Sequence, residues 1–283
     1  MIRRPPRSTQ GVSSAASDVY KRQGKFNAYL TVTDELAMEQ ARSAEAAVMK
    51  GDRLGPLHGI PTSIKDLEST EGIRFTGGSL MHQDRIGSFD TIVVERVKRA
   101  GAIILGKTNT PEFGLLGHTE NRLGDHCRNP WNVERTTGGS SGGAAASIAA
   151  GMASLSTGSD GGGSIRIPCG FCGIYGIKPS QGRIPYYLGP GSDHVMNLFS
   201  QSGPMTRTVA DTAMLLQVLA GPDSRDRAAL REQPDDYIAA TKRGVENLKI
   251  GWTPDFGYAE VDPEVVQVTA NAAKAVSYTH LTL

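Results

Sequence analysis

The chain has 283 residues, of which 39% are hydrophobic and 21% charged, and its formal net charge is +1. A chain of this length can bury a substantial core, and its balanced charge gives no reason to expect a nucleic acid as partner. No apolar run approaches the ~20 residues of a membrane-spanning helix. The three cysteines are too few for a disulfide scaffold. We therefore expect a globular, cytoplasmic protein that binds neither membrane nor nucleic acid.

Both ends of the chain look foreign to the rest. Residues 1–23 are rich in Arg and Ser with little hydrophobic patterning, and both this segment and residues 276–283 resemble translated sequencing-adaptor sequence. Segments of this kind are excluded from fold reasoning. We predict that residues 1–23 and 276–283 are non-native and that residues 24–275 form one domain, truncated at its C-terminal side and therefore poorly stable.

The central part alternates predicted helices with short apolar strands. Residues 34–50 are strong helix formers at helical spacing, with Thr33 or Asp34 as cap and Gly51 as stop. Further along the chain the pattern predicts a strand at 58–66 that ends at Lys65, a helix at 91–100 and a buried strand at 102–105. It then predicts a helix of small residues at 144–152 and a helix with a Thr–Asp capping box at 208–221. A strand at 248–252 and a helix from Asp262 follow. This alternation predicts an α/β sheet covered by helices on both faces.

Two glycine-serine clusters, Gly138–Gly143 and Gly158–Ser164, flank an alanine-rich run. The chain has 34 glycines among its 283 residues, a share well above the usual glycine content of about 7%. Glycine at this density indicates tight turns or close backbone approaches. Several functional motifs compete to explain the clusters and their surroundings.

Two of these motifs have the wrong structural context. Residues 101–108 satisfy the phosphate-loop expression GxxxxGK[ST], but residues 102–105 are predicted as a buried strand and Pro111 stands where a helix should run. Residues 138–142 satisfy GxSxG, the nucleophile elbow, but the preceding VERTT is polar where a buried strand is needed. We expect neither a nucleotide site nor an elbow.

A third motif would make the protein a zinc-dependent deaminase. His118 and Glu120, followed by Pro168, Cys169 and Cys172, match the order H-x-E…P-C-x-x-C. The competing interpretation is two small buried thiols in a glycine-rich turn. The deaminase stays an alternative, and it predicts stoichiometric zinc that is lost in Cys172→Ala.

A fourth interpretation accounts for both clusters at once. The stretches GPLHGIPTSIKD (55–66), GGSSGG (138–143), GSDGGGSIRIP (158–168), FCGIYGIKP (171–179) and SGPMTRTVAD (202–211) together resemble the amidase signature family. The resemblance covers nearly everything between the two foreign ends. It implies a mixed, mostly parallel central sheet with helices on both faces, and a Ser–cisSer–Lys triad without metal or cofactor. Lys65, Ser140 and Ser164 stand at the matching positions.

The resemblance gives each of these residues a chemical role. Ser164 attacks an amide carbonyl, and the resulting acyl-enzyme replaces one difficult step with two easier ones. Lys65 is the base, which must be neutral, and burial favours the neutral form because it penalises the ammonium. Ser140, preceded by a cis peptide bond in the family, relays the proton. The backbone N–H groups of Gly161, Gly162 and Gly163 would stabilise the oxyanion.

Two residues distinguish this chain from other members of the family. Members usually carry Thr or Ile where Gly161 stands, which predicts a looser oxyanion loop. The glutamine-hydrolysing A subunit of a tRNA amidotransferase typically has Gln where Ile167 stands, so we favour a free-standing amidase acting on a small-molecule amide. The amidotransferase protein is the alternative, and a homodimer is left open. We also expect Asp160 and Arg166 to brace the glycine loop, and Ser141 to cap the alanine-rich helix.

Overall fold

The computed structural model describes residues 19, 21–190, 199–244 and 249–280. The chain divides into two compact units, residues 1–238 and 239–283, which are described separately. The first unit holds the sheet and all the predicted site residues. The second contains α8 (Pro263–His280), which begins where the sequence predicts a helix from Asp262.

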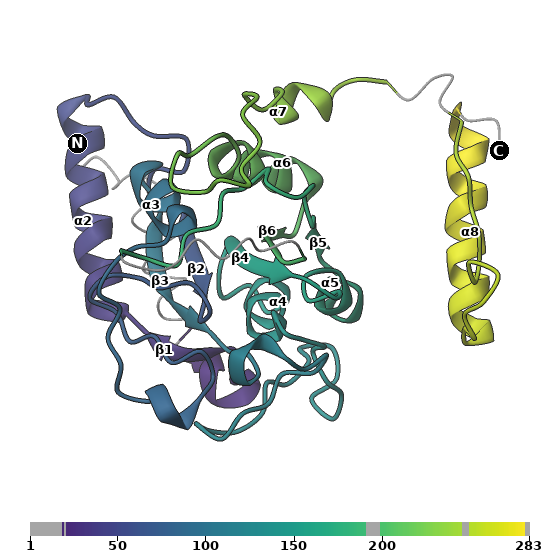
Figure 1. Ribbon diagram of the computed structural model, residues 1–283, viewed down its shortest axis with the longest axis horizontal. Coiled ribbons are helices and arrows are strands. Elements are labelled where there is room, and N and C mark those ends of the chain that lie inside the picture. The colour runs from purple at the N-terminus through teal and green to yellow at the C-terminus, as the bar shows by residue number, and fades with distance from the viewer. Residues whose placement is uncertain (1–18, 20, 191–198, 245–248, 281–283) are drawn as a thin grey trace, which may run out of the picture. The chain divides into compact units, whose positions relative to one another are not determined.

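A six-stranded sheet forms the centre of the first unit (Figure 1). Its order is β1-β3-β2-β4-β6-β5, and the strands span Tyr29–Val32 (β1), Pro61–Lys65 (β2), Ile103–Thr108 (β3), Leu155–Asp160 (β4), Tyr175–Gly176 (β5) and Gln201–Thr206 (β6). Strand β2 pairs in parallel with β3 and β4, whereas the other three neighbouring pairs are antiparallel. The sheet is mixed, as the resemblance implied, and four of its six strands run in one direction. Parallel pairing, however, is confined to the centre.

Helices cover both faces of this sheet. The helical elements of the first unit are α2 (Asp34–Lys50), η1 (Leu80–His82), α3 (Ile92–Arg99), η2 (Glu112–Gly114), α4 (Gly142–Ala149), α5 (Arg166–Cys172) and α6 (Val209–Leu219), and α7 spans Tyr237–Ala240. Successive residues of a strand point to opposite faces. Accordingly, Ile103 and Leu105 of β3 pack in one core with Ile148 of α4, while Ile104 packs in another core with residues of α3 and α6.

The helix boundaries follow the local signals closely. Helix α2 has the predicted range, and Gly51 ends it in the left-handed conformation at φ 76°. Thr33 takes the N-cap position without a capping bond, because its Oγ1 donates to the carbonyl of Ile104 at 2.9 Å. At α6, Thr208 Oγ1 accepts from the backbone N–H of Asp211 at 3.1 Å, which confirms the predicted cap.

The strand boundaries agree less well. Strand β2 is shorter than the predicted 58–66, because Ile60 N–H closes a turn onto the carbonyl of Leu57. Strand β3 continues past residue 105 to Thr108, where pairing with β1 and β2 extends it. Of the strand predicted at 248–252, Lys249 forms a single β-bridge, residues 250–252 have no regular structure, and Leu248 lies outside the described residues.

Part of the N-terminal segment predicted as foreign takes part in the fold. Residues 21–26 are helical, Val19 is fully buried in the first core, and Arg22 Nη1 donates to the carbonyl of Ala150 at 2.7 Å. The origin of residues 1–23 and 276–283 stays a prediction. In the part of the chain that the structure describes, no helix is long and apolar enough to cross a membrane.

Candidate active site

Lys65 lies at the centre of the candidate site. It is the last residue of β2, and its side chain is completely buried. Its Nζ donates to the hydroxyls of Ser140 at 2.7 Å, Ser141 at 2.8 Å and Ser159 at 3.1 Å. The lysine predicted as base is therefore in direct contact with the serine predicted as relay.

The surroundings of Lys65 favour a neutral amine. Burial lowers the pKa of Lys65 to about 7, because removing the ammonium from water is costly, although the negative charges of Glu68 and Asp160 oppose this effect. An ordinary lysine has a pKa of about 10.4. Near neutral pH, a large fraction of Lys65 can thus act as a base.

Ser140 and Ser141 stand at the start of α4. The peptide bond between Gly139 and Ser140 is cis, as the resemblance implied. Residue 139 has no room for a side chain, because a Cβ there would lie 2.7 Å from the carbonyl oxygen of His118. Ser141 takes the N-cap position without a capping bond, and its Oγ accepts instead from Lys65 and, at 3.3 Å, from the N–H of Ser159. The prediction that the Ser141 side chain caps the helix is wrong.

Ser164 lies in the loop between β4 and α5, partly exposed to solvent. Its carbonyl accepts from the N–H of Ser141 at 3.1 Å, which joins the loop to the cis-serine segment. In the described part of the chain no residue forms a hydrogen bond with Ser164 Oγ. The structure therefore joins the Ser164 backbone to a lysine-bound serine, but it shows no hydrogen bond between the Ser164 hydroxyl and Ser140.

The three glycines before Ser164 differ in what their N–H groups bind. The Gly163 amide donates to Asp160 Oδ1 at 2.7 Å. Its φ of +120° and the 2.7 Å that would separate a Cβ from Ile167 Cδ1 restrict the position to glycine. The amides of Gly161 and Gly162 meet no acceptor among the residues described. Two of the three predicted donors therefore have no acceptor in this part of the chain, while the third holds the loop.

Asp160 organises this loop from the end of β4. Its buried carboxylate also accepts from the N–H groups of Ile165 at 3.1 Å and Arg166 at 3.3 Å. The Arg166 guanidinium adds two bonds of 2.9 and 3.0 Å. Burial alone would raise the pKa of Asp160, but these bonds outweigh it and lower the pKa to about 2. Asp160 and Arg166 brace the loop by this geometry.

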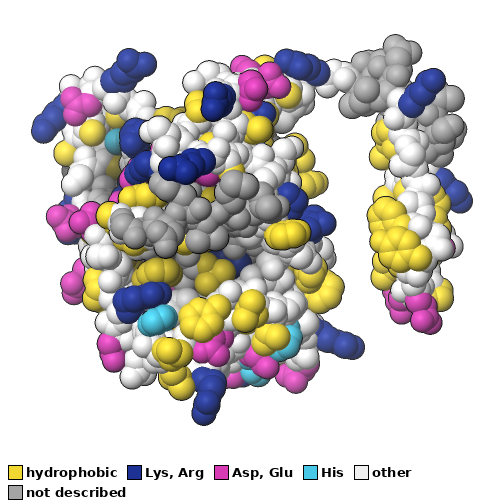
Figure 2. Space-filling model, viewed as in Figure 1, with side chains coloured by type: hydrophobic (Ala, Val, Ile, Leu, Met, Phe, Trp, Pro, Cys, Tyr) yellow, Lys and Arg dark blue, Asp and Glu magenta, His cyan; other side chains and the backbone are white. Residues whose placement is uncertain are grey.

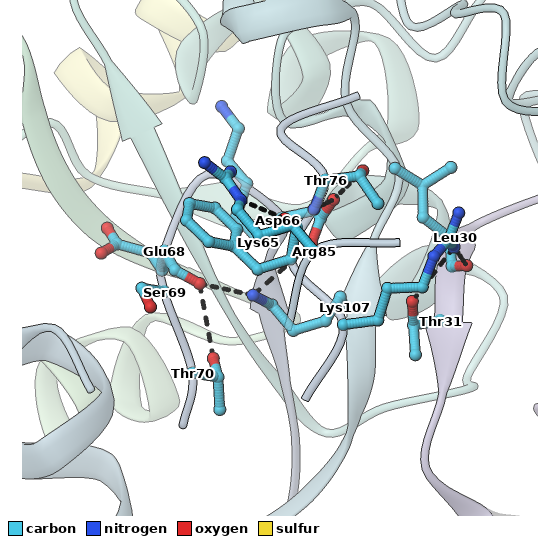
Figure 3. A network of polar contacts seen from close by, with 12 residues as sticks. Leu30, Thr31, Lys65, Asp66, Glu68, Ser69, Thr70, Thr76, Arg85 and Lys107 are labelled. Atoms are coloured by element: carbon cyan, nitrogen blue, oxygen red, sulfur yellow. Dashed lines mark hydrogen bonds and ion pairs between the residues drawn. The ribbon is translucent and has the colours of Figure 1, made fainter. Parts of the chain in front are cut away.

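A second network lies next to Lys65, around Asp66 and Lys107 (Figure 3). Lys107 of β3 is fully buried, with its Nζ 3.5 Å from Asp66 Oδ1 and hydrogen-bonded to the Glu68 carbonyl. The other oxygen of Asp66 accepts from the N–H of Thr76 at 3.0 Å. Lys107 thus ties the end of β2 to β3. It is the lysine of the phosphate-loop pattern, whose residues form a buried strand, as the sequence predicts.

The residues of the zinc-deaminase pattern are not gathered into a metal site. His118 is exposed and pairs with Glu120 at 3.0 Å, whereas the Cys172 thiol donates to the carbonyl of Thr137. Burial raises the pKa of both Cys169 and Cys172 to about 12. Within the described ranges no group of three or more His, Cys, Asp or Glu side chains could hold a metal ion. The two thiols are buried, as the competing interpretation proposed.

The sequence patterns missed two residues beside Lys65. Ser159 bonds its Nζ, and Glu68 is buried three residues beyond it. Ser159 lies in a strand that the sequence does not reveal, and Glu68 follows the conspicuous Lys65–Asp66 pair on the predicted end of a strand. The one sequence signal that could have identified Glu68 is its position among charged residues, close to the proposed base.

Comparisons with known proteins show which family the chain belongs to. A family model described as Amidase matches residues 12–283. The chain is 44% identical over 239 residues to an acylamidase of Rhodococcus erythropolis, covering 84% of this chain and 49% of that protein. It is 45% identical over 249 residues to the A subunit of the glutamyl-tRNA(Gln) amidotransferase of Moorella thermoacetica, covering 88% of this chain and 50% of that protein. The chain spans about half the length of the curated relatives it matches.

A solved structure extends the likeness to three dimensions. A bacterial aryl acylamidase of the amidase signature family superposes with a TM-score of 0.90 at 35% identity, covering 97% of this chain and 56% of that one. Its fold and the family match over nearly the whole sequence lead to one conclusion. The chain belongs to the amidase signature family.

Proposed function

We propose that the protein is an amidase, which hydrolyses the C–N bond of a small-molecule carboxamide through an acyl-enzyme on Ser164. The observation that carries this proposal is the buried Lys65, whose Nζ lies 2.7 Å from Ser140 Oγ at the start of α4. The products would be a carboxylate and ammonia or an amine. The names of the acylamidase and aryl acylamidase relatives support the same reaction class.

The hydrogen bonds of Lys65 suit a proton relay. A neutral amine has two N–H groups and one lone pair. Ser141 and Ser159 can accept the two N–H groups, which leaves the lone pair for the hydroxyl proton of Ser140. Ser140 Oγ can then accept the proton of Ser164 as that serine attacks. The relay needs no metal and no cofactor.

The acylation step follows from this arrangement. Ser164 Oγ bonds to the carbonyl carbon, and its proton passes through Ser140 to Lys65 while the oxyanion accepts from the amides of Gly161 and Gly162. The tetrahedral species collapses, the C–N bond breaks, and the proton returns through Ser140 to the leaving nitrogen. Water then attacks the ester with the same relay and releases the carboxylate. Losing one oxyanion donor costs about 2.7–4 kcal/mol in a serine protease.

The glutamine-hydrolysing A subunit of an amidotransferase is the second candidate, and the similarity to the Moorella thermoacetica protein supports it. We favour the free-standing amidase because such A subunits typically have Gln where Ile167 stands. Ammonia release from glutamine only in the presence of partner subunits would reverse the preference. We further propose a cytoplasmic location, in keeping with three cysteines that are all free thiols. A homodimer remains a prediction.

The proposed function is tested by treating the chain with a phosphonyl or sulfonyl fluoride and mapping the adduct by mass spectrometry. We expect the adduct on Ser164, and a labelling rate that rises with pH through about 7, as Lys65 loses its proton. Lys65→Ala should slow labelling about 10²- to 10⁴-fold. Lys50→Ala, which removes an exposed lysine from the end of α2, should leave it unchanged. No adduct on a chain with native circular dichroism would overturn the proposal.

A further inference from the structure

Glu68 is a buried carboxylate that the proposed triad does not use. It is 5% exposed, and its Oε1 accepts from Ser202 Oγ at 2.7 Å. Its backbone carbonyl accepts from Lys107 Nζ (Figure 3). Both the main chain and the side chain of Glu68 are thus held in place, from β3 and β6. Carboxylates are seldom buried without such partners.

A chain of contacts leads from Glu68 to the base. Ser202 of β6 stands directly opposite Ser159 of β4 in the antiparallel pairing. Residues opposite each other project from the same face of a sheet. Ser159 Oγ in turn accepts from Lys65 Nζ at 3.1 Å. The Glu68 carboxylate and the Lys65 amine therefore each bond one serine of a cross-strand pair, on one face of the sheet.

Few charged groups face either residue. Among the described residues, two carboxylates act on Lys65: Glu68 from the segment after β2 and Asp160 from the end of β4. Asp160 is already engaged by the Arg166 guanidinium and three backbone N–H groups. Glu68 is faced by Lys65, by Lys107, which pairs with Asp66, and by Tyr186, whose pKa rises to about 12 through burial and the Glu68 charge. Of the two carboxylates, Glu68 has the larger electrostatic influence on Lys65.

We propose that Glu68 is a positioning residue that sets the basicity of Lys65, with Ser202 holding its carboxylate on the lysine side of the sheet. This inference rests on the proposed function, in which Lys65 is the base. Burial alone would depress the pKa of the lysine further and make it a weaker proton acceptor. The Glu68 charge offsets part of that loss and keeps the amine both neutral near pH 7 and basic enough to take a proton.

Glu68→Gln tests the charge while keeping a similar shape and an oxygen that can accept from Ser202. We expect the acidic limb of the pH–rate profile for Ser164 labelling to shift to lower pH by about one unit. The plateau rate at high pH should fall several-fold, because the base is weaker. Glu71→Gln is the matched control, since it removes the same charge from an exposed residue three positions away. It should leave both the limb and the plateau unchanged.

A second variant and a second readout keep the test independent of folding and of reactivity. Ser202→Ala leaves the Glu68 charge in place but removes the hydrogen bond that holds its carboxylate. It should therefore shift the acidic limb of the pH–rate profile in the same direction, but by less. Titration of the Lys65 side-chain ¹⁵N resonance, assigned with Lys65→Arg, should show its pKa lowered in Glu68→Gln. An unmoved or raised Lys65 pKa in a folded variant overturns the inference. Failure of wild type to label at Ser164 would instead overturn the proposed function. The two failures can be distinguished, because the titration of Lys65 does not depend on labelling.

Discussion

At the scale of single residues, Asp160 holds the loop that carries Ser164. Its carboxylate accepts three backbone N–H bonds from the turn around Ser164 and two bonds from Arg166. Bonds to a carboxylate are stronger than neutral ones, and an unpaired buried donor is costly. The position of Ser164 and of the Gly161 and Gly162 amides thus depends on one negative charge.

Asp160→Asn should lower the free energy of unfolding by about 2 kcal/mol at pH 7. The folded pKa of about 2 lies below the ordinary value near 3.9. The stabilisation is therefore complete above about pH 4 and is lost as the pH falls through 2. In urea unfolding, the difference in free energy of unfolding between wild type and variant should be about half as large at pH 3 as at pH 7. Asp125→Asn is the control, because its pair with Arg128 is solvent-exposed and should matter little. A loss that is equal at both pH values would contradict the prediction.

The sequence identified some site residues and not others, for physical reasons. Lys65 and Ser140 stand in motifs that resemble a known family, and the structure places them 2.7 Å apart. The contacts of Ser141 and Ser159 with Lys65 depend on how β2, β4 and the start of α4 meet in space. No local pattern encodes that meeting. The catalytic roles of Lys65, Ser140 and Ser164 and of the glycine amides remain predictions.

At the scale of elements, helix α4 is placed by glycines at its start. Gly143 donates its N–H to the carbonyl of Asn109 at 3.1 Å, and a Cβ there would lie 2.3 Å from Asn109 N and 2.5 Å from the Ala28 carbonyl oxygen. All these neighbours are backbone atoms, which cannot move aside cheaply. The helix that carries Ser140 and Ser141 into the site therefore requires glycine at this position.

Gly143→Ala should lower the free energy of unfolding by about 1–3 kcal/mol, the usual cost of overpacking. It should also slow labelling of Ser164, because α4 can no longer approach residues 28 and 109 as closely. Gly170→Ala is the matched control: this glycine lies within α5, and no atom lies within 4 Å of an added Cβ. That change should be neutral or stabilise by about 0.5–1 kcal/mol. Equal unfolding midpoints in urea for the two variants would refute this account of the packing.

Elements with strong local signals were predicted, and those made by tertiary pairing were not. Helix α2 has a glycine stop and helical spacing, and its predicted range is confirmed. Strands β4 (LSTGSD) and β6 (QSGPMT) contain few β-branched or aromatic residues, so they carry little strand signal. Their small side chains instead suit burial in the middle of the sheet beside the site. The same feature that hides these strands in the sequence lets the serines of β4 reach Lys65.

At the scale of the whole molecule, apolar side chains remain exposed on the first unit (Figure 2). Among the described strands, β5 lies at the edge of the sheet and pairs with β6 alone. Around it, Phe171, Tyr175 and Ile177 are 54%, 53% and 40% exposed. An exposed apolar edge is a site for association with another chain. The described part of the first unit therefore combines a well-formed centre with an exposed apolar edge.

We predict that the purified chain is poorly stable and self-associates through the β5 edge. Sedimentation velocity should detect association that grows with concentration, and circular dichroism should show a broad thermal transition below the ~45–65 °C typical of mesophilic domains. Tyr175→Lys should reduce association, because a charged residue on an edge strand opposes pairing with a second copy. Met49→Lys, at an exposed position of α2, adds the same charge away from the edge and should leave association unchanged. A monomer with a cooperative transition in the usual range would contradict the prediction and would also remove the case for a homodimer. Equal effects of the two lysines would mean that net charge, and not the β5 edge, governs the association.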